Sequence, residues 1–298
     1  MKKIIFSVGF CPLQNPIKKI KFDISEVSMK ILRFLSVLLI VLILNKINSA
    51  QDTLTFEKSY LPYPDTTLIF LPDNYDSSDN FPLVILLNGW SGSYKQWNGI
   101  VDLKKLADKY NFVIVTPDGY YDSWYCNNTQ RKNIQYEIFL TEDLLPELFR
   151  KYKIDRSKVF ISGLSMGGHG AITLFMKYND LFLSAGSTSG ILDITQFPQN
   201  WGLPSALGNY EDHKEIWNKN SAYYLIDSLK NKGKEFIVDC GTEDFAFKVN
   251  AKFFHKCKDL KLKITFIARP GRHEKKYWAE SVLYHFDFFT RLLNKINN

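Results

Sequence analysis

The chain has 298 residues, of which 45% are hydrophobic and 15% aromatic, with 16 glycines and 11 prolines. This is the composition of a globular protein and excludes disordered and collagen-like chains. The formal net charge of +7 is concentrated at the N-terminus, because residues 1–50 hold eight basic and two acidic side chains whereas the remainder holds 30 basic and 29 acidic ones. A near-neutral body lacks the basic surface that a nucleic-acid partner requires.

Residues 29–50 have the order of a secretory signal peptide. Lys30 and Arg33 precede the apolar run Phe34–Leu44, and small residues end the segment at Ala50. Charge, apolar run and small-residue end are the three parts of an export signal. Since the run has 11 residues and a membrane-spanning helix needs about 20, we predict an exported protein, periplasmic or secreted, with no stable membrane span after cleavage. A retained anchor is the alternative.

Residues 1–28 resemble no domain. We therefore expect them to be an upstream extension produced by a mis-assigned start, with translation beginning at Met29. The mature chain is then residues 51–298, a normal length for one domain.

The cysteines do not form a disulfide scaffold. The four are Cys11, Cys126, Cys240 and Cys257, and loss of the first leaves three, enough for at most one disulfide. Whether Cys126 and Cys257 pair stays open. The cysteine spacings match no zinc pattern, so we predict no metal site.

From Phe81 onward, short apolar runs alternate with segments of helical periodicity. This pattern predicts a parallel sheet with crossover helices. The expected strands are residues 83–87, 112–116, 159–162, 182–187, 236–240 and 264–267. The expected helices are residues 103–109, 134–152, 166–178, 222–230, 249–258 and 277–293, the second with a possible kink before Pro146. The predicted fold is α/β, a doubly wound, mostly parallel sheet with helices on both faces, in a single domain with its sites on loops after the strands.

One motif carries the chemistry. Gly163-Leu164-Ser165-Met166-Gly167 follows an expected strand and precedes an expected helix, which is the context of the G-x-S-x-G nucleophile elbow of the α/β-hydrolase fold. A serine on so tight a turn has strained backbone angles, and its neighbours must lack Cβ atoms so that strand and helix pass closely. Ser165 is the predicted nucleophile. The alternative is a glycine-rich turn with an incidental serine.

An acid and a base follow in the order that the fold requires, each on a loop after a later strand. His273 is the predicted general base, because it follows the strand 264–267. Asp244 is the favoured acid, since it lies beyond the strand 236–240 on a loop that can turn toward the base. Glu243, on the same loop, and Asp239, inside the strand, remain alternatives.

Backbone amides are the predicted oxyanion hole. The elbow supplies the Met166 N–H, and the glycine-containing loop 88–93 supplies the Trp90 N–H. The alternative for this loop is an ordinary turn between strand and helix.

An aromatic loop, residues 118–125, follows the strand 112–116. Its rings either line a cleft that binds apolar or ring-bearing groups or form a small core of the loop itself. Trp124 and Tyr125 are the predicted substrate-binding residues. His169, at the start of the nucleophile helix, is a third candidate, with packing or hydrogen bonding as the alternative.

Three segments together resemble the putative esterase family. They are residues 163–171, residues 239–245 and residues 270–273, the last followed by Tyr277-Trp278. That family includes S-formylglutathione hydrolases, tributyrin esterases, feruloyl and acetyl xylan esterases and mycolyltransferases, and the similarity covers about residues 55–295. The resemblance implies a cofactor-free serine hydrolase with Ser165, Asp244 and His273 as its triad. Residues 123–125 also resemble the family's pocket-forming loop.

Two departures from the family pattern stand out. Asn88 occupies the place of a histidine, from which we expect weaker support of the oxyanion loop. Three charged residues, Arg272, Glu274 and Lys275, surround the base in place of small and aromatic ones, from which we expect a different choice of substrate.

These observations predict an exported serine carboxylic ester hydrolase that forms an acyl-enzyme. Its expected substrates are short-chain or carbohydrate-linked acetyl or feruloyl esters, mainly from the resemblance. Acyl transfer to a sugar or lipid acceptor is one alternative. A catalytically inactive binding protein of the same fold is another, prompted by Asn88 and Arg272.

Overall fold

The computed structural model describes residues 33–36, 51–57, 60–76 and 79–297. The predicted extension 1–28 and most of the predicted signal peptide 29–50 lie outside these ranges, and residues 33–36 form an exposed helical turn. The described residues from Gln51 onward belong to one compact unit. No described helix is both long and apolar enough to cross a membrane.

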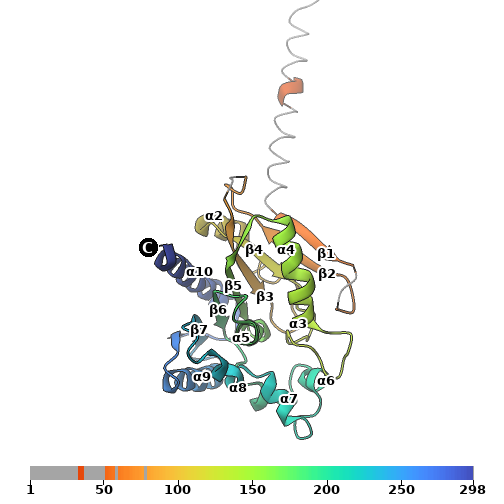
Figure 1. Cartoon of the computed structure of the whole chain (residues 1–298), viewed down its shortest axis with the longest axis vertical. Helices are drawn as coiled ribbons and strands as arrows, with labels where there is room; N and C mark the ends of the chain where they lie inside the picture. The colour runs from red at the N-terminus through yellow and green to blue at the C-terminus, as the bar shows by residue number, and fades with distance from the viewer. Residues whose placement is uncertain (1–32, 37–50, 58–59, 77–78, 298) are drawn as a thin grey trace, which may run out of the picture. The chain divides into compact units, whose positions relative to one another are not determined.

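A single sheet organises the described residues, in the strand order β1-β2-β4-β3-β5-β6-β7-β8 (Figure 1). The strands are β1 (Gln51–Phe56), β2 (Asp65–Phe70), β3 (Phe81–Leu87), β4 (Val113–Pro117), β5 (Ile154–Leu164), β6 (Ser184–Thr188), β7 (Glu235–Gly241) and β8 (Lys263–Arg269). Strand β2 pairs antiparallel with β1 and β4, and all the other pairs are parallel. The predicted mostly parallel α/β sheet is confirmed.

Helices cover both faces of the sheet (Figure 1). The α-helices from Leu103 onward are α2 (Leu103–Tyr110), α3 (Tyr136–Ile138), α4 (Leu145–Lys151), α5 (Met166–Lys177), α6 (Leu203–Leu207), α7 (Lys214–Lys219), α8 (Ala222–Leu225), α9 (Phe247–Asp259) and α10 (Lys275–Asn297), of which α6 and α7 lie away from the sheet. Alternate strand residues enter different cores: Val84 and Leu86 pack with α2 and α10, whereas Leu83 and Ile85 pack with α4, α5 and α9. Such strands are buried on both faces and therefore read as continuous apolar runs.

The predicted helix 134–152 is not one regular α-helix. It consists of α3, a π-helical segment η1 (Phe139–Leu144) and α4, whose first turn contains Pro146. Proline lacks an N–H and its ring crowds the preceding turn, so the wider π turn lies on the N-terminal side of Pro146. The predicted helix 222–230 likewise divides, into α8 and the 3₁₀ segment η3 (Ile226–Leu229).

The sequence pattern missed two strands and two α-helices. Strand β1 is mostly exposed at the sheet edge, and β2 precedes the region where the alternation of strands and helices begins. Helices α6 and α7 have five and six residues, too few to show a helical period.

Candidate active site

Ser165 lies at the sharp turn between β5 and α5. Its backbone has φ 54° and ψ −117°, and its N–H donates to the Thr188 carbonyl at 3.0 Å. A Cβ on Gly163 would lie 2.3 Å from the Gly167 oxygen, and one on Gly167 would lie 2.3 Å from the Leu87 oxygen. Neither glycine can carry a side chain without moving the backbone, which is the steric demand that the motif predicts.

The structure brings Ser165, His273 and Asp244 into one line of hydrogen bonds. The Ser165 Oγ lies 2.9 Å from the His273 Nε2, and the His273 Nδ1 lies 2.9 Å from Oδ2 and 3.1 Å from Oδ1 of Asp244. The Asp244 side chain is fully buried and also accepts a hydrogen bond from the Ala246 N–H at 2.8 Å. A buried carboxylate at Nδ1 places the imidazole proton there, so Nε2 is left to accept the serine proton.

The two alternative acids do not contact His273. Glu243 pairs with Arg272 at 3.1 Å, and both side chains are more than half exposed. Asp239 is fully buried and bonds instead to Thr188 and His285.

Neighbouring rings hold the imidazole of His273. Its centroid lies 4.5 Å from that of Phe245 and 5.1 Å from that of Trp278. The loop before it turns at Gly271, whose φ of 148° favours glycine. A Cβ on Gly241 would lie 2.2 Å from the Gly271 oxygen, so the segments that carry Asp244 and His273 touch each other.

The predicted oxyanion donors are the backbone amides of Trp90 and Met166. Among the described residues, neither N–H donates a hydrogen bond to another protein group. Trp90 lines the same cavity as Ser165, and Met166 follows Ser165 in the chain. Two unsatisfied donors beside a nucleophile are what an oxyanion hole offers.

Asn88 supports the loop 88–93, which carries Trp90. Its Oδ1 accepts from the Gly119 N–H at 2.8 Å, and its Nδ2 donates to the Gly89 carbonyl at 3.0 Å. Gln96 adds a hydrogen bond from the Gly89 N–H to its Oε1 at 2.7 Å. The buried Asn88 amide therefore ties this loop to the neighbouring loop that contains Gly119.

The charges around the base point outward. Arg272, Glu274 and Lys275 are exposed, and Arg272 is bonded to Glu243. The two features that prompted the interpretation as an inactive binding protein thus leave the line of hydrogen bonds intact.

A cavity of about 170 Å³ opens at Ser165 and His273. Five aromatic side chains line it: Trp90, Trp124, Trp201, Phe245 and Trp278. A larger hollow of about 270 Å³ lies between β1 and α4 and contains none of these residues. The described residues contain no cluster of His, Cys, Asp and Glu arranged to hold a metal ion.

Of the three predicted substrate-binding residues, Trp124 alone lines the cavity. Its Nε1 donates to the Trp201 carbonyl at 3.0 Å, which fixes the ring. Tyr125 lies beneath the cavity wall, with its hydroxyl donating to the Asn88 carbonyl at 2.8 Å. His169 is buried behind Trp124, edge to face at 5.5 Å between centroids. The prediction that Tyr125 and His169 bind substrate is corrected. Both side chains are buried and pack behind the residues that line the cavity.

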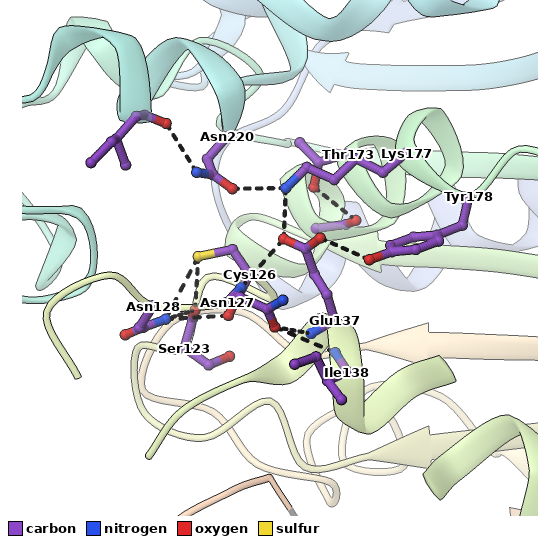
Figure 2. Close-up of polar contacts among 12 residues, drawn as sticks. Ser123, Cys126, Asn127, Asn128, Glu137, Ile138, Thr173, Lys177, Tyr178 and Asn220 are labelled. Atoms are coloured by element: carbon purple, nitrogen blue, oxygen red, sulfur yellow. Dashed lines mark hydrogen bonds and ion pairs between the residues drawn. The ribbon is translucent and has the colours of Figure 1, made fainter. Parts of the chain in front are cut away.

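A partly buried polar cluster anchors the segment that carries Trp124 (Figure 2). Lys177 on α5 pairs with Glu137 on α3 at 2.6 Å and donates to Asn220 at 2.8 Å. Asn127, on the Trp124 loop, accepts from the Glu137 N–H at 3.0 Å. The cluster joins helix α5, the segment that follows Trp124 and the segment before α8, so the cavity wall is tied to the helix that begins after Ser165.

Sequence patterns did not reveal all of the cavity residues. Ile191 and Trp201 come from the long connection between β6 and β7, where no motif or period marks them. Phe245 and Trp278 adjoin the motifs of Asp244 and His273, so their proximity to those residues was the available signal.

Comparison with known proteins gives a consistent result. Residues 60–288 match the family described as Putative esterase. The chain is 25% identical over 232 residues to an acetyl esterase of Caldicellulosiruptor saccharolyticus, covering 72% of this chain and 85% of that one. It is 24% identical over 271 residues to an S-formylglutathione hydrolase of Arabidopsis thaliana, covering 80% and 94%. The structure of the serine hydrolase FphF of Staphylococcus aureus superimposes with a TM-score of 0.71 at 19% identity, covering 81% and 98%.

Proposed function

Because the chain belongs to the putative esterase family and is a carboxylic ester hydrolase of the serine type, we propose that Ser165, His273 and Asp244 are its catalytic triad. The observation that carries this proposal is the line of hydrogen bonds from Asp244 through His273 to Ser165 at the aromatic cavity.

The proposed reaction passes through an acyl-enzyme. The Ser165 Oγ bonds to the ester carbonyl carbon while the His273 Nε2 takes its proton, and the carbonyl oxygen becomes an oxyanion held by the Trp90 and Met166 amides. Collapse breaks the ester C–O bond, and the leaving alcohol takes the proton from His273. Water then attacks the acyl carbon by the same route, releasing the acid and restoring Ser165.

The proposed substrates are short-chain or carbohydrate-linked esters, including acetyl and feruloyl esters. The small, aromatic-lined cavity supports an acyl group of limited size, and one relative is named an acetyl esterase. We propose hydrolysis over acyl transfer, and adding an alcohol acceptor to the assay separates the two by product: a transferred ester as the main product would favour transfer.

Export is also part of the proposal, and it is supported by the order of charge, apolar run and small residues in 29–50. N-terminal sequencing of protein collected outside the cytoplasm should begin near Gln51. Peptides from residues 1–28 in that product would contradict the proposed start at Met29.

Replacement of the nucleophile tests the function. We expect Ser165→Ala to lower kcat/KM on p-nitrophenyl acetate and feruloyl esters by about 10³-fold or more, as removal of a triad serine does. Ser157→Ala, at the exposed end of the same strand, is the matched control and should retain activity. A fluorophosphonate should label the unmodified chain and not Ser165→Ala. Equal hydrolysis by the two serine variants would refute the proposal.

A further inference from the structure

A second line of serine, histidine and aspartate lies in the core beneath the active site. The Ser162 Oγ is 2.7 Å from the His285 Nδ1, and the His285 Nε2 is 2.6 Å from the Asp239 Oδ2. The side chains use the opposite ring nitrogens from those used at the active site, where serine faces Nε2 and aspartate faces Nδ1. All three residues have no exposed surface, so no substrate reaches them in this conformation.

The network has two further members. The Ser281 Oγ donates to the Asp239 Oδ2 at 2.5 Å, and the Thr188 Oγ1 donates to the Asp239 Oδ1 at 2.9 Å. The Asp239 carboxylate therefore accepts hydrogen bonds from Thr188 on β6 and from Ser281 and His285 on α10. Gly186 makes room for the ring, since a Cβ there would lie 2.5 Å from the His285 Nδ1.

Each segment that carries a proposed triad residue contributes to this network. Ser162 lies on β5, three residues before Ser165, and Asp239 lies on β7, five residues before Asp244. Ser281 and His285 lie on α10, the helix that follows the His273 loop. The network therefore links the three triad-bearing segments through side chains.

The network also reaches the nucleophile through the backbone. Thr188, whose hydroxyl bonds to Asp239, accepts the Ser165 N–H with its carbonyl at 3.0 Å. The next residue, Ser189, donates its N–H to the Asp239 carbonyl at 2.9 Å. The turn at Ser165 is thus bonded to the end of β6. That end is in turn bonded to the side chain of Asp239 through Thr188 and to its carbonyl through Ser189.

We propose that Ser162, Thr188, Asp239, Ser281 and His285 are positioning residues that hold the nucleophile, acid and base segments in the relative placement that the reaction needs. Buried polar groups are costly unless they are fully hydrogen-bonded, and apolar packing would fill this space without that cost. A displacement of about 1 Å at a reacting group lowers a rate by about 10²-fold. The proposal rests on the catalytic triad proposed above.

The test compares hydroxyl removals of similar structural cost. Ser162→Ala and Thr188→Val each remove one hydroxyl of the network, and Ser184→Ala removes a buried hydroxyl that bonds to the Glu235 carbonyl at the far end of β6. We expect the two network variants to lower kcat on p-nitrophenyl acetate by about 10-fold to 10²-fold with little change in KM. Ser184→Ala should keep its kcat at a similar loss of Tm. Thr188→Ser, which restores the hydroxyl, should lose less kcat than Thr188→Val.

A second measurement does not depend on catalysis. Without substrate, amide hydrogen exchange in residues 163–167, 241–245 and 270–274 should quicken in Ser162→Ala and Thr188→Val relative to Ser184→Ala. If Ser184→Ala loses as much kcat, and exchanges its amides in these three segments as fast, as network variants with the same Tm, the positioning role is wrong. If the unmodified chain is inactive, the triad proposal fails while the exchange result still decides this one.

Discussion

At the scale of single residues, the site depends on backbone conformations that most side chains avoid. Ser165 has a positive φ, as do Ser91, Trp124, Tyr125 and Ser189 around it. Such conformations cost free energy and persist where the surroundings hold them. Here the surroundings are hydrogen bonds, among them Ser91 N–H to the Tyr121 carbonyl at 2.8 Å and Ser189 N–H to the Asp239 carbonyl at 2.9 Å.

His169 makes stability depend on pH. Burial, with a smaller contribution from the Lys177 charge, lowers its pKa to about 3, whereas an unfolded histidine has a pKa of about 6.5. Between these values the unfolded chain binds a proton that the folded chain does not, so the free energy of unfolding falls as the pH falls below about 6.5. The loss from this residue should reach about 2 kcal/mol near pH 5.

Urea unfolding at pH 7 and pH 5 measures this loss. His169→Phe should lose less stability between the two pH values than the unmodified chain does, because other titrations are common to both. His255→Phe, which removes an exposed histidine on α9, should behave like the unmodified chain. An equal pH dependence in all three proteins would contradict the assignment of the effect to His169.

At the scale of elements, helix α5 passes very close to the end of β3. Gly167 makes it possible, since a Cβ there would lie 2.3 Å and 2.5 Å from the Leu87 and Asn88 oxygens. Asn88 in turn begins the oxyanion loop, so this one approach sets the distance between the nucleophile and the loop that carries Trp90.

We expect Gly167→Ala to destabilise the fold by about 3 kcal/mol, the upper end of the usual cost of overpacking, and to abolish most activity. The matched control is Gly99→Ala, where the nearest atom to an added Cβ is 3.4 Å away, and it should change stability by less than about 1 kcal/mol. Chemical unfolding gives both values. Similar losses in the two variants would show that the approach of α5 to β3 is not tight.

Element prediction succeeded where local pattern and environment agree. Strands β3 and β4 are almost entirely buried and apolar, and they begin and end within two residues of the predicted runs. Strand β5 contains its predicted run but begins five residues earlier, with exposed residues that show no apolar pattern. The edge strand β1 was missed because its exposed residues show no buried run, and the π segment before Pro146 cannot be distinguished from an α-helix by spacing alone.

At the scale of the whole molecule, parallel strands bring distant residues to one edge of the sheet. Ser165 follows β5, Asp244 follows β7 and His273 follows β8, and these strands lie near one another in the sheet order.

The core of the molecule also encloses the cysteine thiols. Cys126, Cys240 and Cys257 are buried and free in the structure, and burial raises the pKa of Cys126 and of Cys257 to about 12.

These thiols should be inert in the folded protein. In a Cys11→Ser chain, which leaves the three core cysteines, we expect an aromatic disulfide reagent to modify none of them at pH 8 until denaturant is added, and then all three. A reducing agent should leave Tm unchanged. Fewer than three reactive thiols in non-reducing denaturant would instead reveal a disulfide.

Several features of this protein could be predicted from the amino-acid sequence, because local chemistry dictates them. The glycines around Ser165 specify a tight turn between strand and helix, continuous apolar runs specify buried parallel strands, and chain order specifies that acid and base follow on later loops. Those constraints act within a few residues, so a single chain displays them. The contacts of Asp244 with His273, and of both with Ser165, agree with that order.

Other features became visible only in the folded chain. Asp244 is the one of three neighbouring carboxylates that contacts His273, Tyr125 and His169 lie behind the cavity wall, and Asn88 bonds to Gly89 and Gly119. It also disclosed Trp201 in the cavity and the buried network around Asp239. These features depend on the direction of side chains and on contacts between residues that are far apart in the sequence, in some cases by more than a hundred positions. No local period or motif encodes such contacts, because they arise only when the sheet brings the segments together.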